Sequence, residues 1–365
     1  MHILQIGKYF LPVKGGIEKT TLDIADVLND DNQKSDLLCF GSVGENYLYK
    51  STAVFQFEPL ISLWNFDFSF KYILKLIRLY RSCDIVHLHY PNILPTIIIC
   101  VLQRFVKKPV VLHWHSDILV HKFAYSLFRP FEKMLLKISE SVIYTSKNYL
   151  MMSNSLPLSL SKSVIMPSPI SPIPEITGSK WLLSDHSRER FFVYFIGRHV
   201  SYKGLDVLLD AANLVRKDTV FIIAGIGPLT AKLKESCTNN QVIFTGRISD
   251  QEHFELLNDC HVFCLPSNTR AEAYGLVIGE ALSAGTAVVC SDLEGSGMSW
   301  LNKIGETGLT FMNDSPEDLA EKIDYLNVNR SILNEYGVNA RHRYKSELTL
   351  QKFGESLKNL YGTIK

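Results

Sequence analysis

Two glutamates in the second half of the chain lie where they could accept hydrogen bonds from a ligand. Glu272 and Glu280, with seven residues between them, lie in the segment RAEAYGLVIGEALSA, which follows the apolar run CHVFCLP and a short loop. The spacing of the apolar residues over 276–282 predicts a helix packed on a sheet, and Gly275 lets the backbone approach a ligand closely. A helix N-terminus binds phosphate, whereas carboxylates accept hydrogen bonds from sugar hydroxyls. The segment therefore predicts a site that receives both kinds of group.

A pair of cations follows another apolar run in the same half. The run FFVYFIG leads into Arg198, and Lys203 comes five residues later, before the helical pattern LDVLLDAANLV. An arginine offers a bidentate fork and a lysine a movable point charge. Together they can neutralise a diphosphate without a metal ion.

Glycines and histidines mark the first half. Gly15 and Gly16 follow the long loop GKYFLPVK, and His115 ends the buried run PVVLHWH. Alternation along a strand places His113 on the same side as His115, but His115 lies nearer the strand end. His87 and His89 could imitate a metal site, yet no third ligand has suitable spacing, so we expect no metal.

Short apolar runs alternate with helical patterns in two series, which predicts two doubly wound α/β domains with parallel sheets. The first series is HILQIG, SDLLCF, DIVHLHY, PVVLHWH and SVIYTS, and the second is FFVYFIG, TVFIIAG, QVIFTG, CHVFCLP and TAVVCSD. Proline-rich and polar sequence separates them. We expect an N-terminal domain over 1–175, a linker over 176–190, a C-terminal domain over 191–345, and a helix over 346–365 that returns to the first domain.

Composition describes an ordinary globular protein and excludes several classes. The chain has 365 residues with 38 Lys+Arg against 37 Asp+Glu, a balance that does not favour a nucleic-acid partner. Its seven cysteines are scattered without a C-x-x-C motif, as in a reducing compartment. No signal peptide and no apolar run of about 18 residues is recognisable, so we expect a cytoplasmic protein.

Positive charge is nevertheless concentrated in the first half. Residues 68–147 hold twelve Lys/Arg and four acids, a surplus of +8. Within this region KYILKLIRLYR and HKFAYSLFRPFEKMLLKI combine cations with large apolar residues at helical spacing. Such helices either cover a sheet or rest on an anionic membrane surface. The charge pattern by itself leaves these two alternatives open.

Five motifs in order resemble the retaining glycosyltransferases of family 4, which have the GT-B fold. They are K-G-G-I-E, G-R-x-x-x-x-K-G, A-G-I-G-P-L, T-G-R-I-S and E-A-Y-G-L-x-x-x-E-A, and the resemblance spans nearly the whole chain. It implies two Rossmann-like domains facing across a cleft, an N-terminal one for the acceptor and a C-terminal one for the nucleotide sugar, with no cofactor and no catalytic metal. The segment VIMPSPISPI departs from the Pro-Asn-Gly or Pro-x-Gly that relatives usually carry.

The resemblance also implies roles for residues that match the family's motifs. Catalytic roles fall to His115, which faces the donor sugar, and to Glu272, Arg198 and Lys203. The donor-binding set is Gly15, Gly16, Arg198, Lys203, Ile248, Glu272, Tyr274, Gly275, Leu276 and Glu280. In this set Arg198 and Lys203 bind the diphosphate, Glu280 the ribose, and Glu272 the transferred sugar. Ile248 lies near the base, and Gly16 lies closest to the reacting centre.

The substrate follows from a narrower resemblance. The stretch LEGSGMSWLNKIGETGL and the sequence HSDI resemble bacterial transferases that build O-antigen and related surface polysaccharides. This implies transfer of a hexosyl unit, with GDP-mannose as first choice of donor and a UDP-hexose or UDP-N-acetylhexosamine as the alternative. The implied acceptor is a sugar on polyprenyl diphosphate. With the basic first half, this acceptor implies a peripheral position at the inner face of the cell membrane.

Three other functions remain open. A nicotinamide-dependent enzyme is disfavoured because the first run lacks G-x-G-x-x-G and the second ends at Gly41, where a ribose-binding acid would be expected. A noncatalytic sugar-binding protein would more naturally have lost the glutamates and cations. A sugar-nucleotide epimerase of the same fold would convert the donor without an acceptor.

Overall fold

The chain forms two compact α/β units. The computed structural model describes residues 1–365 except 14, 32, 42–43, 64–65, 119–121, 177, 179, 181–189 and 365. The first unit comprises Met1–Pro169 with Leu350–Lys365, and the second comprises Ile170–Thr349. The division falls six residues before the expected boundary at 175, because Ile170 and Ile173 are buried in the core of the second unit. Of the expected linker, residues 177, 179 and 181–189 lie outside the described part.

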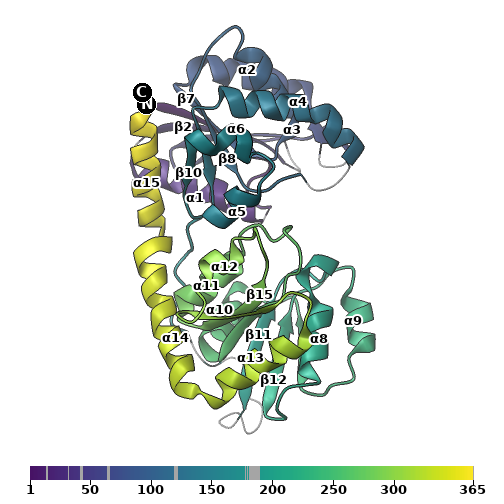
Figure 1. The fold of residues 1–365 in the computed structure, drawn as a ribbon. Helices are drawn as coiled ribbons and strands as arrows, with labels where there is room; N and C mark the ends of the chain where they lie inside the picture. The colour runs from purple at the N-terminus through teal and green to yellow at the C-terminus, as the bar shows by residue number, and fades with distance from the viewer. Residues whose placement is uncertain are drawn as a thin grey trace. The chain divides into compact units, whose positions relative to one another are not determined.

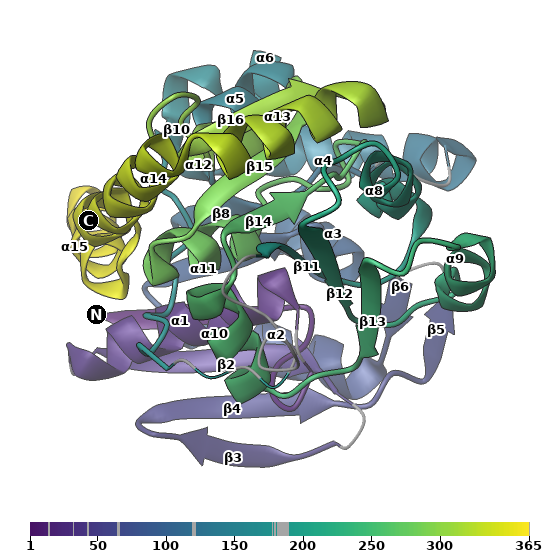
Figure 2. The same ribbon diagram turned by 90° about the horizontal axis from the view of Figure 1, so that it is seen from below.

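The first unit is built on a sheet that contains eight strands of the described chain. Their order is β10-β9-β8-β7-β1-β2-β4-β3, parallel throughout except for β3, which pairs antiparallel with β4 at one edge (Figure 2). The strands are β1 (His2–Ile6), β2 (Lys34–Phe40), β3 (Asn46–Tyr49), β4 (Thr52–Phe57), β7 (Ile85–Tyr90), β8 (Val110–Trp114), β9 (Ser141–Tyr144) and β10 (Ser163–Ile165). A two-stranded hairpin, β5 (Ile61–Leu63) and β6 (Phe66–Phe68), is separate from this sheet.

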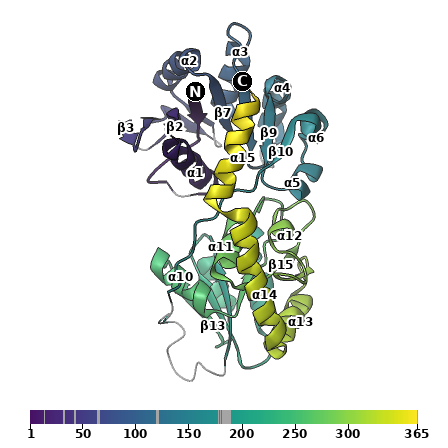
Figure 3. The same cartoon turned by 90° about the vertical axis from the view of Figure 1, so that its left-hand side faces the viewer.

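Helices cover both faces of this sheet, as continuously apolar strands require. Helix α1 (Gly16–Asp30) and helix α15 (Leu350–Thr363) share one face, where their apolar residues form a core with Ile3, Ile85 and Val111 (Figure 3). Helices α2 (Phe70–Ser82), α3 (Ile93–Leu102) and α4 (Lys122–Ile138) cover the other face (Figure 1). Two short helices, α5 (Lys147–Met152) and α6 (Leu156–Ser159), follow β9.

The second unit has a parallel sheet of six described strands in the order β13-β12-β11-β14-β15-β16. They are β11 (Phe191–Ile196), β12 (Thr219–Ala224), β13 (Val242–Gly246), β14 (Val262–Leu265), β15 (Ala287–Asp292) and β16 (Gly308–Met312). The order reverses between β11 and β14. In doubly wound sheets this switch point, outside the carboxyl ends of the strands, is where ligands bind.

The helices of the second unit follow their strands in the βαβ rhythm. They are α8 (Leu205–Ala212), α9 (Thr230–Ser236), α10 (Asp250–Asp259), α11 (Leu276–Ala284), α12 (Met298–Leu301), α13 (Pro316–Val328) and α14 (Arg330–Arg343). A π-helical turn over Tyr344–Leu348 joins α14 to α15. The doubly wound fold class is thereby confirmed for both units. In the described part of the chain, no helix combines the length and the hydropathy needed to cross a membrane.

Candidate active site

The loop after β11 carries Lys203 to the loop after β14. Lys203 ends a short 3₁₀ turn over Ser201–Lys203, and Gly204 follows with φ of +62°. A Cβ atom at Gly204 would overlap the carbonyl oxygen of Pro266. Both the left-handed backbone and this close contact therefore require glycine. The tight fit places the cation beside the glutamate-bearing loop.

Lys203 and Glu272, predicted separately from the sequence, form an ion pair. The Lys203 Nζ lies 2.5 Å from Glu272 Oε2, and the two side chains are only 10% and 13% exposed. The hydroxyl of Ser267 donates to the same carboxylate oxygen at 3.2 Å. The hydroxyl of Ser296 donates to the backbone carbonyl of Glu272 at 2.6 Å. An ammonium group has three N–H donors, so Lys203 can hold Glu272 and still bind a phosphate oxygen.

Arg198 lies in a different part of the same sheet end. It lines an open pocket of about 470 Å³ that Arg247 also lines, and both arginines are exposed. The other lining residues are Ile196, Gly197, Gly225, Ile226, Gly227 and Pro228. Gly225 has φ of +111°, and a Cβ atom there would overlap the carbonyl oxygen of Gly197. The pocket thus combines close-packed backbone with two guanidinium groups, a suitable environment for phosphate oxygens.

Sequence analysis did not assign Arg247, although the T-G-R-I-S motif contains it. Arg247 could have been found from the sequence, because it is a cation directly after an apolar strand, as Arg198 is. The next residue, Ile248, is half-buried and packs against the core of the second unit. Its assignment to the nucleotide base stays a prediction.

The N-terminus of α11 has the expected form. Gly275 is its N-cap residue with φ of +84°, and a Cβ atom there would lie 3.1 Å from Met298 Cγ. Leu276 begins the helix. Tyr274 is buried, and its ring stacks on Trp300 with 6.4 Å between ring centroids. The side chain of Tyr274 thus fixes the loop, while the backbone of this segment carries the N–H groups suited to an anion.

Glu280 is held by a histidine that sequence analysis missed. The Oε2 atom of Glu280 lies 3.2 Å from Nε2 of His253, and Nδ1 of His253 lies 2.9 Å from the hydroxyl of Tyr194. Burial raises the pKa of Tyr194 well above its usual value, so its hydroxyl keeps its proton and donates to Nδ1. His253 then donates from Nε2 to the carboxylate. The signal in the sequence was a histidine on the apolar face of α10, beside Leu256 and Leu257.

In the first unit, the two glycines stand where α1 begins. Gly15 is the N-cap residue, in extended conformation, and Gly16 is the first residue of the helix. The carboxylate of Glu18 folds back so closely that it occupies the space of a side chain at Gly15. Burial raises the pKa of Glu18, and the nearby charge of Lys8 acts in the opposite direction.

His115 lies directly after β8 and is bonded to a second histidine. Its Nε2 atom is 2.8 Å from Nδ1 of His89, and burial lowers the pKa of His115 to about 3. The ring of His113 stacks on His115 with centroids 4.3 Å apart, so the two share a face as alternation predicts. Asp117 has a structural role, because its carboxylate accepts hydrogen bonds from Trp114 Nε1 at 2.9 Å and from the Ser153 hydroxyl at 2.7 Å.

The expectation that His87 and His89 lack a third ligand was wrong. Ring nitrogens of His87, His89 and His113 lie within 4.8 Å of one another, because β7 and β8 are neighbours and His89 is in register with His113. Spacing along the sequence did not show this cluster, because it arises from strand pairing.

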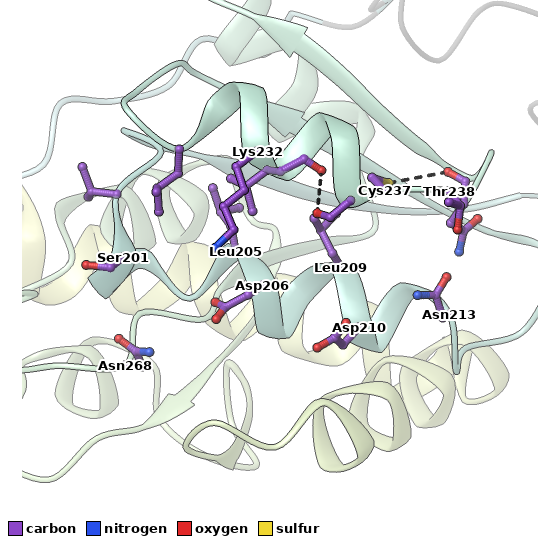
Figure 4. Close-up of a pocket in the computed structure, with 15 residues that line it drawn as sticks. Ser201, Leu205, Asp206, Leu209, Asp210, Asn213, Lys232, Cys237, Thr238 and Asn268 are labelled. Atoms are coloured by element: carbon purple, nitrogen blue, oxygen red, sulfur yellow. Dashed lines mark hydrogen bonds between the residues drawn. The ribbon is translucent and has the colours of Figure 1, made fainter.

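A further pocket of about 420 Å³ lies in the second unit, where side chains of α8 and α9 face each other (Figure 4). Its lining includes Asp206, Asp210 and Lys232, together with apolar residues of both helices. Two carboxylates make it a poorer place for a diphosphate than the pocket at Arg198 and Arg247. None of the site residues proposed from the sequence lines it.

Comparisons with known proteins agree with this geometry. Residues 14–172 match the family described as Glycosyltransferase Family 4, and residues 184–343 match Glycosyl transferases group 1. The chain is 26% identical to O-antigen chain mannosyltransferase C of Escherichia coli, with 100% of this chain and 99% of the relative covered. It is 28% identical to the D-rhamnosyltransferase WbpZ of Pseudomonas aeruginosa, with 79% and 76% covered. A crystal structure of Anabaena HepE in complex with UDP superposes with a TM-score of 0.78 at 17% identity over 100% of both chains.

Proposed function

Since the chain belongs to the GT-B glycosyltransferases of family 4, we propose that it transfers a hexosyl unit from a nucleotide-diphosphate sugar to a lipid-linked sugar, with retention of configuration. The observation that carries the proposal is the fixed pair of carboxylates in the second unit. Lys203 holds Glu272 at 2.5 Å, and His253 holds Glu280 at 3.2 Å. Carboxylates held in this way accept hydrogen bonds from hydroxyl groups. The cations and the N-terminus of α11 serve the diphosphate.

Charge development explains how these residues act. As the glycosidic bond breaks, negative charge grows on the departing diphosphate and the anomeric carbon becomes cationic. Arg198, Arg247 and Lys203 stabilise the departing oxygens more in the transition state than in the ground state, which lowers the barrier. Three cations in one unit allow this without a metal ion, and we propose a metal-independent reaction in which the departing phosphate assists deprotonation of the acceptor hydroxyl.

We propose GDP-mannose as the donor. The Escherichia coli relative, which spans this chain end to end, is named as a mannosyltransferase. A UDP-hexose or UDP-N-acetylhexosamine is the alternative, favoured by the presence of UDP in the HepE crystal structure. The proposed acceptor is a sugar on polyprenyl diphosphate, in keeping with the O-antigen assembly named for the same relative.

The first unit carries a surface suited to a membrane-bound acceptor. On α2 the apolar side chains of Phe70 and Leu74 are 65% and 69% exposed, and Lys71, Arg78 and Arg81 are exposed on the same helix. Apolar side chains insert at the headgroup boundary, and each cation near an anionic surface adds about 1 kcal/mol of attraction. We propose that this α2 surface attaches the enzyme to the cytoplasmic leaflet.

The donor is tested by thermal stabilisation followed by transfer. Purified protein is heated with GDP-mannose, UDP-glucose, UDP-N-acetylglucosamine or NADH, and a specific ligand raises the melting temperature because it binds the folded state. The stabilising sugar nucleotide is then incubated with polyprenyl-diphosphate N-acetylglucosamine, and the lipid product is analysed by mass spectrometry. Addition of one hexose supports the proposal. Conversion of the donor without acceptor favours the epimerase, and stabilisation by NADH alone overturns the transferase assignment.

Attachment is tested separately by flotation with vesicles that contain about one third anionic lipid. The double substitution Phe70→Ser and Leu74→Ser is expected to abolish flotation of a protein that floats in its natural form. The matched control is Val338→Ser, which replaces a side chain 70% exposed in the second unit and leaves flotation unchanged. Equal flotation of the α2 variant and the natural protein would refute the α2 surface as the attachment site.

A further inference from the structure

A chain of hydrogen bonds on one face of the first sheet ends at His115. The side-chain nitrogen of Gln5, on β1, lies 2.8 Å from the backbone carbonyl oxygen of Thr21 on α1. The same nitrogen lies 3.0 Å from Nε2 of His89, on β7. Nδ1 of His89 lies 2.8 Å from Nε2 of His115. Four groups from β1, α1, β7 and the end of β8 therefore form one continuous series.

The backbone carbonyl of Thr21 fixes the direction of every bond in this series. A carbonyl oxygen only accepts, so the Gln5 atom beside it must be the amide nitrogen and cannot be the amide oxygen. That nitrogen has a second N–H, which it directs to His89 Nε2. His89 Nε2 must then accept, because two donors cannot be bonded to each other.

The rest follows from the chemistry of neutral imidazole, which has one N–H and one lone pair. His89 accepts at Nε2, so its proton is on Nδ1 and is donated to His115 Nε2. His115 accepts at Nε2, so its own proton is on Nδ1. We propose that Gln5 and His89 are positioning residues that hold His115 in the neutral Nδ1–H form, as a hydrogen-bond donor at the carboxyl end of the sheet.

The hydrogen bonds themselves leave both rings neutral, because a ring nitrogen that accepts carries no proton. Burial acts in the same direction. His89 is fully buried, and burial together with the neighbouring histidines lowers its pKa well below the usual value. Burial lowers the pKa of His115 to about 3. A cationic ring would carry two N–H groups and lose its directional role. Near neutral pH the tautomer is therefore defined.

The consequence for catalysis rests on the proposed function. The ring nitrogen of His115 that could act as a base is occupied by His89, and the nitrogen that remains carries a proton. His115 therefore donates a hydrogen bond to an oxygen of the sugar donor and does not remove the acceptor's proton. This agrees with a reaction in which the departing phosphate takes that proton.

The same bonds argue against a metal at the nearby histidine cluster. A metal ion needs a lone pair from each of His87, His89 and His113. Both nitrogens of His89 are already engaged, one by Gln5 and one by His115. Metal binding through His89 would break the series, so the two arrangements exclude each other.

The tautomer can be measured directly in the protein without substrate. Long-range ¹H–¹⁵N spectra of protein with ¹⁵N-labelled histidine distinguish a protonated nitrogen from an unprotonated one, and His115→Asn assigns the His115 signals. His261 provides a built-in reference, because the backbone N–H of Phe192 donates to its Nδ1 at 3.0 Å and forces the opposite, Nε2–H form. We expect Nδ1–H for His115 and Nε2–H for His261. Nε2–H at His115, or one equivalent of bound zinc in the purified protein, would overturn the proposal.

Two variants separate positioning from structural support. Gln5→Leu removes the donor to His89, so the Nδ1–H fraction of His115 is expected to fall while His261 is unchanged. Tyr361→Phe is the matched control, because it removes a buried hydrogen bond to His87 on the same face but leaves the series intact. An unchanged His115 signal in Gln5→Leu would refute the role of Gln5, as would an equal change in Tyr361→Phe.

Kinetics then link the tautomer to transfer. We expect Gln5→Leu to lower kcat about tenfold with donor KM within about twofold, since loss of one oriented hydrogen bond is worth about 1 kcal/mol or more. The spectra require no activity, so an inactive protein with the expected tautomer would contradict only the proposed function. An active transferase with the opposite tautomer would contradict only the present proposal.

Discussion

The histidines that contact proposed site residues lie in opposite electrostatic settings in the two units. In the second unit His253 bridges a tyrosine and the carboxylate of Glu280, and a lysine–glutamate pair lies in the same unit. In the first unit His115 is bonded to His89 and stacks on His113, and burial lowers the pKa of His87 and His115 to about 3. One unit therefore presents fixed charges, and the other presents neutral donors and acceptors.

This difference suits the ligand chemistry proposed for each unit. A diphosphate carries charge and is bound best by cations and a helix N-terminus. A sugar ring is neutral and is recognised by oriented hydrogen bonds. A network of neutral histidines can provide such bonds without binding ions. The neighbours of a buried histidine therefore decide its role. A histidine beside a carboxylate serves a charged site, whereas a histidine buried among other histidines is neutral.

The largest effect should come from breaking the charged pair in the second unit. Lys203→Ala removes a cation from the departing diphosphate and leaves the Glu272 carboxylate, 13% exposed, without its ion-pair partner. We expect transfer to fall by about 10³-fold, the size seen when a preorganised charge-stabilising group is lost. Stability should fall by about 3–5 kcal/mol, because a buried charge is left unpaired. Initial rates and urea unfolding measure the two effects.

A double substitution separates these contributions. Lys203→Met with Glu272→Gln removes both charges, so most of the lost stability should return while activity stays low. If the double variant were as unstable as Lys203→Ala, desolvation of Glu272 would not be the cause. Near-natural turnover in either variant would show that the diphosphate site lies elsewhere.

Low pH should destabilise the network of neutral histidines in the first unit. His87, His89, His113 and His115 in the first unit have lowered pKa values, His87 and His115 to about 3 against an unperturbed 6.5. Below pH 6.5 these histidines are protonated in the unfolded chain but not in the folded unit, so the free energy of unfolding falls as pH falls. Glu18, Asp23 and Glu132, with raised pKa values, offset part of this loss. We expect a slope of about 3 kcal/mol per pH unit near pH 6 in the first unit.

The second unit should respond about half as steeply. Burial lowers the pKa of His261 to about 4 and also lowers that of His199. Hydrogen exchange with mass spectrometry, corrected with unfolded protein at each pH, gives the stability of each unit separately. His113→Gln should reduce the slope of the first unit by about 1 kcal/mol per pH unit. Equal slopes in the two units would contradict the comparison.

The sequence was sufficient for the repeated part of the fold. Each of the ten apolar runs became a strand, because parallel strands covered on both faces are recognisable as continuous apolar sequence. Strands β3, β4, β10 and β16 of the two sheets were missed, because their residues are only partly buried and do not form continuous apolar runs. The expected domain boundary at 175 differs from the observed one because Ile170 and Ile173 are buried in the core of the second unit. Local composition does not show contacts with residues far away in the sequence.

Site residues divided in the same way. Residues in strand-end loops, such as Lys203 and Glu272, could be proposed from motif and position, and the structure brings these two together as an ion pair. Residues that act through another side chain, such as Gln5, His89 and His253, were not assigned these roles. Their roles depend on which atoms face one another across paired strands or between helices. A single sequence can mark a residue such as His253 on an apolar face, but it does not show the partner of that residue.

A moderate effect should distinguish the cations that bind the diphosphate from those that do not. Arg198→Ala and Arg247→Ala should each raise donor KM by about 10–100-fold, since a hydrogen bond to a charged group is worth about 1.5–3 kcal/mol. Arg216→Ala is the matched control, because that exposed arginine of the same unit pairs with Asp218 outside the pocket. If Arg247→Ala behaved like the control, only Arg198 would belong to the site.

The smallest effect should come from the histidine behind Glu280. His253→Leu removes the donor to Glu280 and leaves the buried Tyr194 hydroxyl without its acceptor, so donor KM should rise about fivefold, in line with about 1 kcal/mol for one hydrogen bond. His253→Gln retains an N–H group near the position of Nε2 and should return KM to within about twofold of the natural protein. Saturating donor should restore kcat in both variants, because Glu280 acts in binding. A loss of kcat that glutamine does not rescue would mean that His253 supports the fold of α10 and not the orientation of the carboxylate.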